Sequence, residues 1–170
     1  LSEEGHEFRE LYGLQSDGLF QTQDDVDNSP VTNASVKPGD VKYKDISGPD
    51  GTPDGVINDL DRTFLGSSSP RNIYGGRINM AYKGFDFGLA FQGVGKQNFF
   101  LSQSFIRPFL ESWLTPSQEY ASSYWSVNNS VEDNLNAKYP RLTETSSGNN
   151  YRFSDFWLKK GGYLRIKTLA

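Results

Sequence analysis

The sequence of 170 residues contains no cysteine, which excludes disulfide bonds and thiolate chemistry. It has a single histidine, so a histidine-based metal or catalytic cluster is excluded as well. No apolar run approaches the roughly 20 residues that a membrane-spanning helix needs, whereas membrane strands are short and alternating and are not excluded. The net charge of −4, without a basic stripe, argues against nucleic acid as a partner.

Aromatic residues are abundant, at 14% of the chain, although all hydrophobic residues together reach only 35%. The mean hydropathy is correspondingly low, at −0.62. Many large rings in a polar background rich in Gly and Ser are typical of aromatic-girdled β-structure with long polar loops, whereas an ordinary soluble core uses more Leu, Ile and Val. The composition therefore indicates a mainly β chain.

The clearest periodicity lies in residues 72–95, which we interpret as a hairpin of a membrane barrel. Residues 72–82 alternate between a face that carries Ile78 and Met80 between tyrosines and a face that is small and polar. Lys83-Gly84 provides a two-residue turn. A soluble, half-exposed hairpin explains this segment equally well, because one hairpin of alternation is a weak signal. The return strand carries on its apolar face Phe85, Phe87, Leu89 and Phe91.

The remaining chain divides into three regions. Residues 1–71 predict a strand segment, a short helical turn capped by Thr22 and an acidic loop. Residues 96–155 predict a long extracellular loop region with a short helix near 116–125, capped by Thr115. Residues 156–170 predict the start of a C-proximal hairpin, which groups Leu164, Ile166 and Thr168 on one face. The expected fold is therefore mainly β, with antiparallel hairpins from part of a transmembrane β-barrel, long irregular loops and one or two short helices.

The acidic loop at residues 50–61 has the spacing of a twelve-residue calcium loop. Gly55 stands where that loop turns sharply, and oxygen-bearing residues recur at alternate positions. The other interpretation is an Asp/Asn/Gly turn with solvated carboxylates. In either case no nucleophile or base surrounds the loop, so the expected role is structural. The possible calcium ligands are Asp50, Thr52, Asp54, Val56 and Asp61, with Asp45 and Ser47 as alternative early ligands.

Motifs that occur in a fixed order extend over nearly the whole chain. They are YGLQSDGLFQTQDD (12–25), GDVKYKDISGPDGTPDGVINDLDRTFLG (39–66), PRNIYGG (70–76), YKGFD (82–86), FQG (91–93), AKYPRL (137–142) and SDFWLKKGGYLRIKTLA (154–170). This ordered set resembles the C-proximal region of SusC/RagA-type TonB-dependent outer-membrane transporters.

The resemblance implies a location in the cell outer membrane and contact with the lipid bilayer. It implies that a much longer parent imports glycan or peptide fragments, energised by TonB and working with a SusD-like lipoprotein. The present chain would then not be transport-competent by itself. In that setting the aromatic residues of the 96–155 region face the lipoprotein or the substrate, or else pack inside the loop. These residues are Trp113, Tyr120, Tyr124 and Trp125.

Two other functions are compatible with parts of the sequence. The chain is alternatively a self-contained extracellular β-domain that binds carbohydrate through aromatic residues and has a structural calcium loop. A glycosidase with paired carboxylates is disfavoured, because none of the acidic residues stands in an apolar frame that would raise its pKa. The sequence therefore predicts a protein that is not an enzyme.

Overall fold

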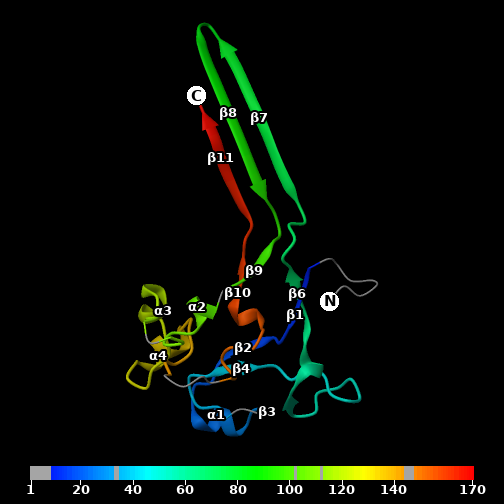
Figure 1. The fold of residues 1–170 in the computed structure, drawn as a ribbon, viewed down its shortest axis with the longest axis vertical. Helices are drawn as coiled ribbons and strands as arrows, with labels where there is room; N and C mark the ends of the chain where they lie inside the picture. The colour runs from blue at the N-terminus through cyan, green and yellow to red at the C-terminus, as the bar shows by residue number, and fades with distance from the viewer. Residues whose placement is uncertain (1–8, 33–34, 102, 112, 144–147) are drawn as a thin grey trace. The chain divides into compact units, whose positions relative to one another are not determined.

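The computed structural model describes residues 9–32, 35–101, 103–111, 113–143 and 148–170. Within these ranges the chain is mainly β, with paired strands and a few short helices (Figure 1), which confirms the predicted fold class. No helix of the described ranges has the length and apolar content needed to cross a bilayer. The chain forms two compact units: the sheet unit, with residues 66–100 and 158–170 and the N-terminal segment to Leu11, and the loop unit, with residues 12–65 and 101–157.

The sheet unit is built on a three-stranded antiparallel sheet in the order β11–β8–β7. β7 (Ile73–Tyr82) and β8 (Phe85–Val94) pair along their whole length. The turn between them has positive φ at both residues, 48° at Lys83 and 85° at Gly84. Two-residue hairpin turns need this backbone conformation because it matches the twist of the strands. The hairpin is therefore present as predicted.

The C-terminal strands do not pair with each other, so the hairpin predicted within residues 156–170 is wrong. β10 (Leu158–Lys160) pairs with β9 (Asn98–Phe100), and β11 (Tyr163–Leu169) pairs with β8. The glycines between β10 and β11 do not reverse the chain, since the Gly161 N–H donates to the carbonyl oxygen of Gln97 at 2.8 Å. The C-terminal segment instead runs antiparallel to the stretch from β8 to β9, so that β10 lies beside β9 and β11 lies beside β8.

A β-bulge in β11 decides which side chains share a face. Ile166 and Thr168 oppose consecutive residues of β8, so Lys167 is an extra residue in the strand. Because side chains alternate between faces, the extra residue moves Thr168 away from the face of Ile166 and brings Leu169 onto it. The sequence-based grouping of Thr168 with Ile166 is therefore wrong.

The loop unit contains short strands and single-turn helices. β2 (Ser16–Leu19) pairs antiparallel with β4 (Val41–Tyr43), and β3 (Val31–Thr32) pairs parallel with β5 (Val56–Ile57). β1 (Glu10–Gly13) pairs with β6 (Thr63–Ser67), and both strands cross the boundary between the units in sequence. The helices are α1 (Gln23–Asp27), η1 (Asp59–Asp61), α2 (Gln103–Ile106), α3 (Gln118–Ser122), α4 (Val131–Leu135) and η2 (Asp155–Trp157).

The helix predicted near 116–125 is shorter than expected and begins later. The cap of α3 is Ser117, whose hydroxyl accepts a hydrogen bond from the Tyr120 N–H at 3.2 Å. Thr115 was the predicted cap, but Ser117 offers the same hydroxyl two residues further on. α3 ends at Ser122, before Trp125.

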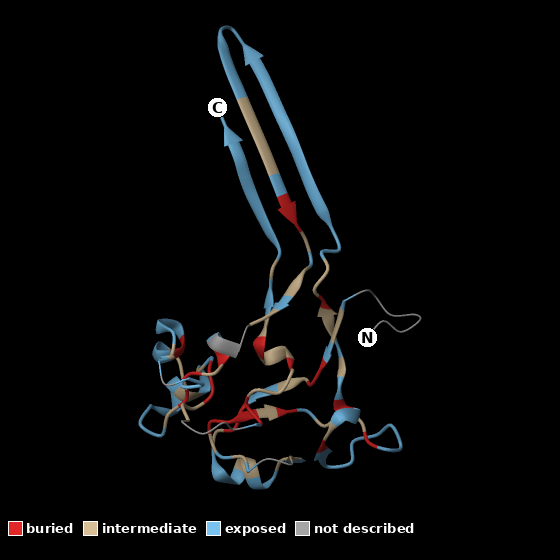
Figure 2. Cartoon of the chain, in the orientation of Figure 1, coloured by how far each residue is buried: buried red, intermediate tan, exposed pale blue. Residues whose placement is uncertain are grey.

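The core of the loop unit joins segments far apart in sequence. Its buried side chains come from both 12–65 and 101–157 (Figure 2), so the segments that the sequence divided into 1–71 and 96–155 fold together. The central cluster consists of Leu14, Leu19, Val41, Tyr43, Ile57 and Trp125.

Two buried asparagines take the place of a strand neighbour for β4. The Val41 N–H donates to Asn150 Oδ1 at 2.8 Å, and Asn149 Nδ2 donates to the Val41 carbonyl oxygen at 2.7 Å. The Tyr43 hydroxyl and Trp157 Nε1 in turn donate to the carbonyl oxygens of Asn149 and Asn150, both at 2.7 Å. Because buried backbone groups need hydrogen-bond partners, these contacts fix the 101–157 segment onto β4.

Gly39→Ala is expected to destabilise the loop unit by roughly 2–3 kcal/mol, from strained backbone and overpacking. Gly39 has φ of +87°, and a methyl group there would overlap the buried Trp125 ring. Gly51 is the matched control, because its φ is +74° but no atom lies within 4 Å of an added Cβ. Urea unfolding followed by tryptophan fluorescence should show a loss of only about 1 kcal/mol for Gly51→Ala. Equal losses in the two variants would contradict the packing of Trp125 on Gly39.

Candidate functional site

One face of the three-stranded sheet is apolar on every strand. The register of β7 with β8 and the bulge in β11 bring these side chains onto the same side. We call this set the apolar face. Its members are Tyr74, Gly76, Ile78, Met80, Tyr82, Phe85, Phe87, Leu89, Phe91, Gly93, Leu164, Ile166 and Leu169.

The apolar face is exposed rather than covered. Phe85 is 81% exposed, Ile166 63% and Ile78 45%, and all ten residues of β7 are exposed (Figure 2). Phe87 is 38% exposed, and Phe91 is half-buried. A soluble sheet buries such a face under a second layer, and contiguous apolar patches of this kind mark surfaces made for a protein or membrane partner.

Aromatic rings lie close to the two glycines of this face, Gly76 and Gly93. A Cβ atom added at Gly76 would stand 2.8 Å from Phe91 Cζ, and one added at Gly93 would overlap the Tyr74 ring. The Tyr74 hydroxyl also donates to the carbonyl oxygen of Tyr163 at 3.3 Å. Each ring thus covers the glycine opposite it, which keeps the apolar face continuous where a side chain is missing.

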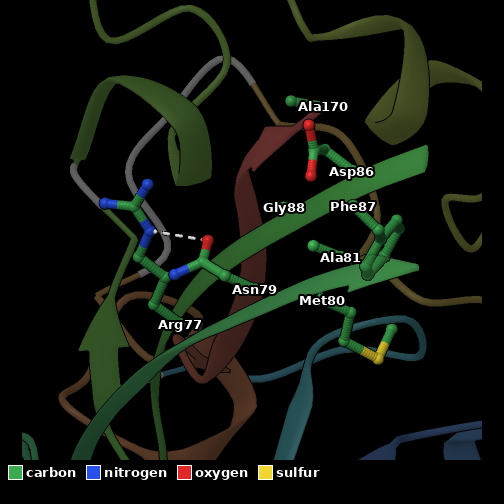
Figure 3. Close-up of a pocket in the computed structure, with 8 residues that line it drawn as sticks. All are labelled: Arg77, Asn79, Met80, Ala81, Asp86, Phe87, Gly88 and Ala170. Atoms are coloured by element: carbon green, nitrogen blue, oxygen red, sulfur yellow. Dashed lines mark hydrogen bonds between the residues drawn. The ribbon is translucent and has the colours of Figure 1, made fainter. Parts of the chain in front are cut away.

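The opposite face of the hairpin is small and polar. Arg77 Nε donates to Asn79 Oδ1 at 3.2 Å, and Asp86 lies on β8 opposite Ala81 (Figure 3). These three residues line an open cavity of about 370 Å³ that also reaches Met80 and Phe87. This face is small and polar, as the alternation of residues 72–82 predicted.

The acidic loop holds its carboxylates mainly against backbone N–H groups. Asp61 is fully buried: its Oδ1 accepts from the N–H groups of Ile46 and Ser47 at 2.8 and 3.1 Å, and its Oδ2 from that of Asn58 at 2.8 Å. Asp45 accepts from the N–H groups of residues 54 and 55 at 3.3 and 2.6 Å. These two carboxylates therefore organise the loop.

The proposed calcium ligands are only partly brought together. Asp45 lies within reach of Asp61, whereas Asp50, Thr52 and the backbone-bound Asp54 are exposed. Within the described ranges no three Asp, Glu, His or Cys side chains are grouped as a metal site would need. The geometry fits a loop stabilised by its own amides better than a ready-made calcium site, and calcium binding stays a prediction.

The stability of the acidic loop is expected to fall at low pH because of Asp61. Burial raises the pKa of this carboxyl, but the N–H groups of Asn58, Ile46 and Ser47 outweigh burial and hold the pKa below its ordinary value of 3.8. A depressed folded-state pKa contributes stability that is present above the unfolded pKa and is lost as the pH falls through the folded pKa. Asp61→Asn should cost about 1–3 kcal/mol at pH 7. Urea unfolding should show that the difference in unfolding free energy between the variant and the wild type becomes smaller below about pH 4. A difference that stays constant down to pH 2 would contradict this role of Asp61.

The four aromatic residues predicted as contacts have different environments. Tyr120 is fully buried and stacks on Tyr139 with ring centroids 4.5 Å apart, and its hydroxyl donates to the Pro140 carbonyl oxygen. Trp125 is 5% exposed and belongs to the core. Tyr124 is half-buried. The structure thus gives Tyr120 and Trp125 the internal-packing role, which corrects their prediction as contacts, and leaves Trp113, at 75% exposure, free to meet a partner.

Part of the apolar face could not be located from the sequence. Leu164, Ile166 and Leu169 join it only because β11 pairs with β8 and contains a bulge. The alternation in YLRIKTL was a visible signal for a strand, but neither its neighbour nor the extra residue has a local signature.

Comparison with known proteins gives one informative similarity. The chain is 25% identical over 168 residues, 98% of its length, to TonB-dependent receptor P3 of Formosa agariphila. It spans about 15% of the length of that curated relative. No protein-family model matches the chain. The chain is therefore similar to one segment of a TonB-dependent receptor.

Proposed function

We propose that this chain is part of an outer-membrane active importer energised by TonB. The observation that carries the proposal is the exposed apolar face, which spans three strands and has a small polar face behind it. Membrane barrels alternate in this way, with apolar side chains toward lipid and polar ones toward the lumen. The similarity to TonB-dependent receptor P3 supports the same role, transport rather than catalysis.

Strand length supports contact with a bilayer. β7 and β8 have ten residues each, and a transmembrane strand needs about 9–11. Tyr74 and Tyr82 stand near the two ends of β7, with Ile78 and Met80 between them. Aromatic residues at both ends of an apolar stretch are typical of the two membrane interfaces.

We further propose that the parent protein is of the SusC/RagA type and imports glycan or peptide fragments with a SusD-like lipoprotein. The ordered motifs of the sequence support this finer assignment. In the parent, the sheet unit would contribute strands to the barrel wall, and the loop unit would belong to its extracellular loops. The chain by itself is not transport-competent.

The test is the location of the protein produced from the complete reading frame. Cell fractionation should place it in the outer membrane, and unheated samples should migrate faster than boiled ones in gel electrophoresis, as folded barrels do. Recovery in a soluble fraction would contradict the proposal. The alternative, a self-contained carbohydrate-binding domain, predicts that residues 1–170 form a monomer without detergent whose melting temperature rises with added calcium.

Trp113→Ala is expected to weaken binding of the lipoprotein partner. Trp113 is 75% exposed, and large exposed aromatic side chains dominate interface energetics. Co-purification of the lipoprotein with the tagged receptor should fall several-fold, by about 2 kcal/mol in binding free energy at most. Val127→Ala is the control, since Val127 is 81% exposed in the same region but small. Unchanged co-purification of the Trp113 variant would remove this residue from the interface.

A further inference from the structure

The two units of the chain carry opposite charge. Residues 12–65 and 101–157 hold 16 acidic and 8 basic residues. The strands and turns of the sheet unit, residues 66–100 and 158–170, have a single acidic residue, Asp86. Residues 66–100 and 158–170 are therefore strongly basic, although the whole chain has a net charge of −4. The basic residues of these two ranges are Arg71, Arg77, Lys83, Lys96, Lys159, Lys160, Arg165 and Lys167.

Half of these basic residues gather at one end of the apolar face. We call Arg71, Lys96, Lys159 and Lys160 the basic end. The Arg71 N–H donates to the Lys96 carbonyl oxygen at 3.2 Å, so these two residues are neighbours. β10 lies beside β9, with Lys160 opposite Asn98 and Lys159 opposite Phe99. The hairpin turn at the other end has only Lys83 (Figure 1).

The three lysines of the basic end are available to a ligand. All four residues are exposed. Within the part of the chain that the structure describes, Lys96, Lys159 and Lys160 make no ion pair. Phe99, opposite Lys159, is 46% exposed. The basic end thus combines unpaired ammonium groups with an exposed ring.

The position of the basic end points to a lipid headgroup. The apolar face begins at Tyr74, three residues after Arg71, and its return strand leaves the face at Gly93, three residues before Lys96. If the ten-residue strands cross the hydrocarbon layer, these bases lie at the level of the headgroups. Lysine stems there can follow apolar surface while the ammonium groups reach phosphate.

We propose that the basic end binds the phosphate of anionic lipid headgroups at one surface of the membrane. The proposal rests on the membrane contact of the apolar face described above. The complementary partner is a phosphate-bearing lipid rather than an acidic protein, because the basic residues lie in the segments that directly adjoin the strands of the apolar face. Each Lys or Arg near an anionic surface contributes about 1 kcal/mol, so three lysines have a measurable effect.

The test uses the full-length protein in mild detergent and native mass spectrometry with phosphatidylglycerol and phosphatidylcholine. The wild type should bind phosphatidylglycerol more tightly than phosphatidylcholine. Lys96→Gln/Lys159→Gln/Lys160→Gln should lower that preference about tenfold or more, as expected for three surface charges. The control Lys37→Gln/Lys44→Gln/Lys138→Gln removes three exposed lysines of the loop unit and should leave the preference unchanged.

The outcomes separate this inference from the proposed function. Equal binding of the two lipids by the wild type, or an unchanged preference in the triple variant, overturns the basic end as a phosphate site while membrane contact stands. Binding of neither lipid counts against the apolar face itself. Should the triple variant fail to fold, the wild type still decides: raising the salt from 0.05 to 0.5 M should remove most of the preference, and a salt-independent preference overturns the inference.

Discussion

Replacing Ile78 with lysine is expected to prevent outer-membrane assembly of the protein that contains this chain, whereas the same change at Asn79 is expected to leave assembly intact. The two residues are consecutive in β7 and both are exposed. Ile78 opposes Leu89 on the apolar face, and Asn79 opposes Gly88 on the polar face. A lysine on the lipid side near the bilayer centre costs about 2–4 kcal/mol, whereas a position facing the lumen is solvated.

The measurement is the folded fraction in isolated outer membranes, from heat-modifiable gel migration. The Asn79→Lys variant controls for the loss of a native residue and for lysine in a strand. A soluble, half-exposed hairpin would accept lysine at both positions, since both are already in contact with solvent. Normal assembly of the Ile78 variant would therefore remove the main support for the transport function.

Arg141→Ala is expected to destabilise the loop unit by about 3–5 kcal/mol. Asp40 is fully buried and accepts from Arg141 Nε at 2.8 Å and from Arg141 Nη2 at 3.3 Å. It also accepts from Asn150 Nδ2 at 2.8 Å and from the Lys37 N–H at 2.9 Å. Removal of the guanidinium leaves a buried carboxylate without a countercharge, which is far more costly than the pair itself is stabilising.

The matched control is Arg62→Ala, which breaks an exposed ion pair. Arg62 Nη2 lies 3.0 Å from Asp59 Oδ1, but the two side chains are 45% and 79% exposed. Water screens such a pair, so a loss of about 0–1 kcal/mol is expected. Urea unfolding of both variants gives the comparison, and Asp40→Asn in the Arg141→Ala background should recover part of the loss. Similar losses at the two arginines would show that the buried pair does not hold the loop unit together.

The elements that were predicted correctly have a local cause in the sequence. The alternation of residues 72–95 and the Lys83-Gly84 turn lie within one continuous segment. The two-residue period and the turn residues were therefore sufficient to predict the hairpin. Thr22 caps α1 through its hydroxyl, which accepts from the Asp25 N–H. The polar–apolar division of the hairpin follows from the same alternation.

The elements that were missed depend on contacts distant in sequence. The pairing of β11 with β8 and the bulge at Lys167 have no local signature, so a hairpin within 156–170 was the simplest expectation. Asn149 and Asn150 looked like polar loop residues, yet they are buried because their amides satisfy the backbone of Val41. The Asp61 carboxylate matched a calcium ligand by spacing, but its neighbours in space are backbone N–H groups.

Membrane contact of the apolar face is tested most directly by nitroxide labels at single cysteines along β7 of the full-length protein in outer membranes. Collisions with oxygen report lipid, and collisions with a water-soluble nickel complex report the aqueous phase. Labels at positions 78 and 80 should favour oxygen, and labels at 77, 79 and 81 should favour nickel, in strict alternation. High nickel accessibility at all five positions, or protection of 78 and 80 from both reagents, would contradict the placement of this face against hydrocarbon.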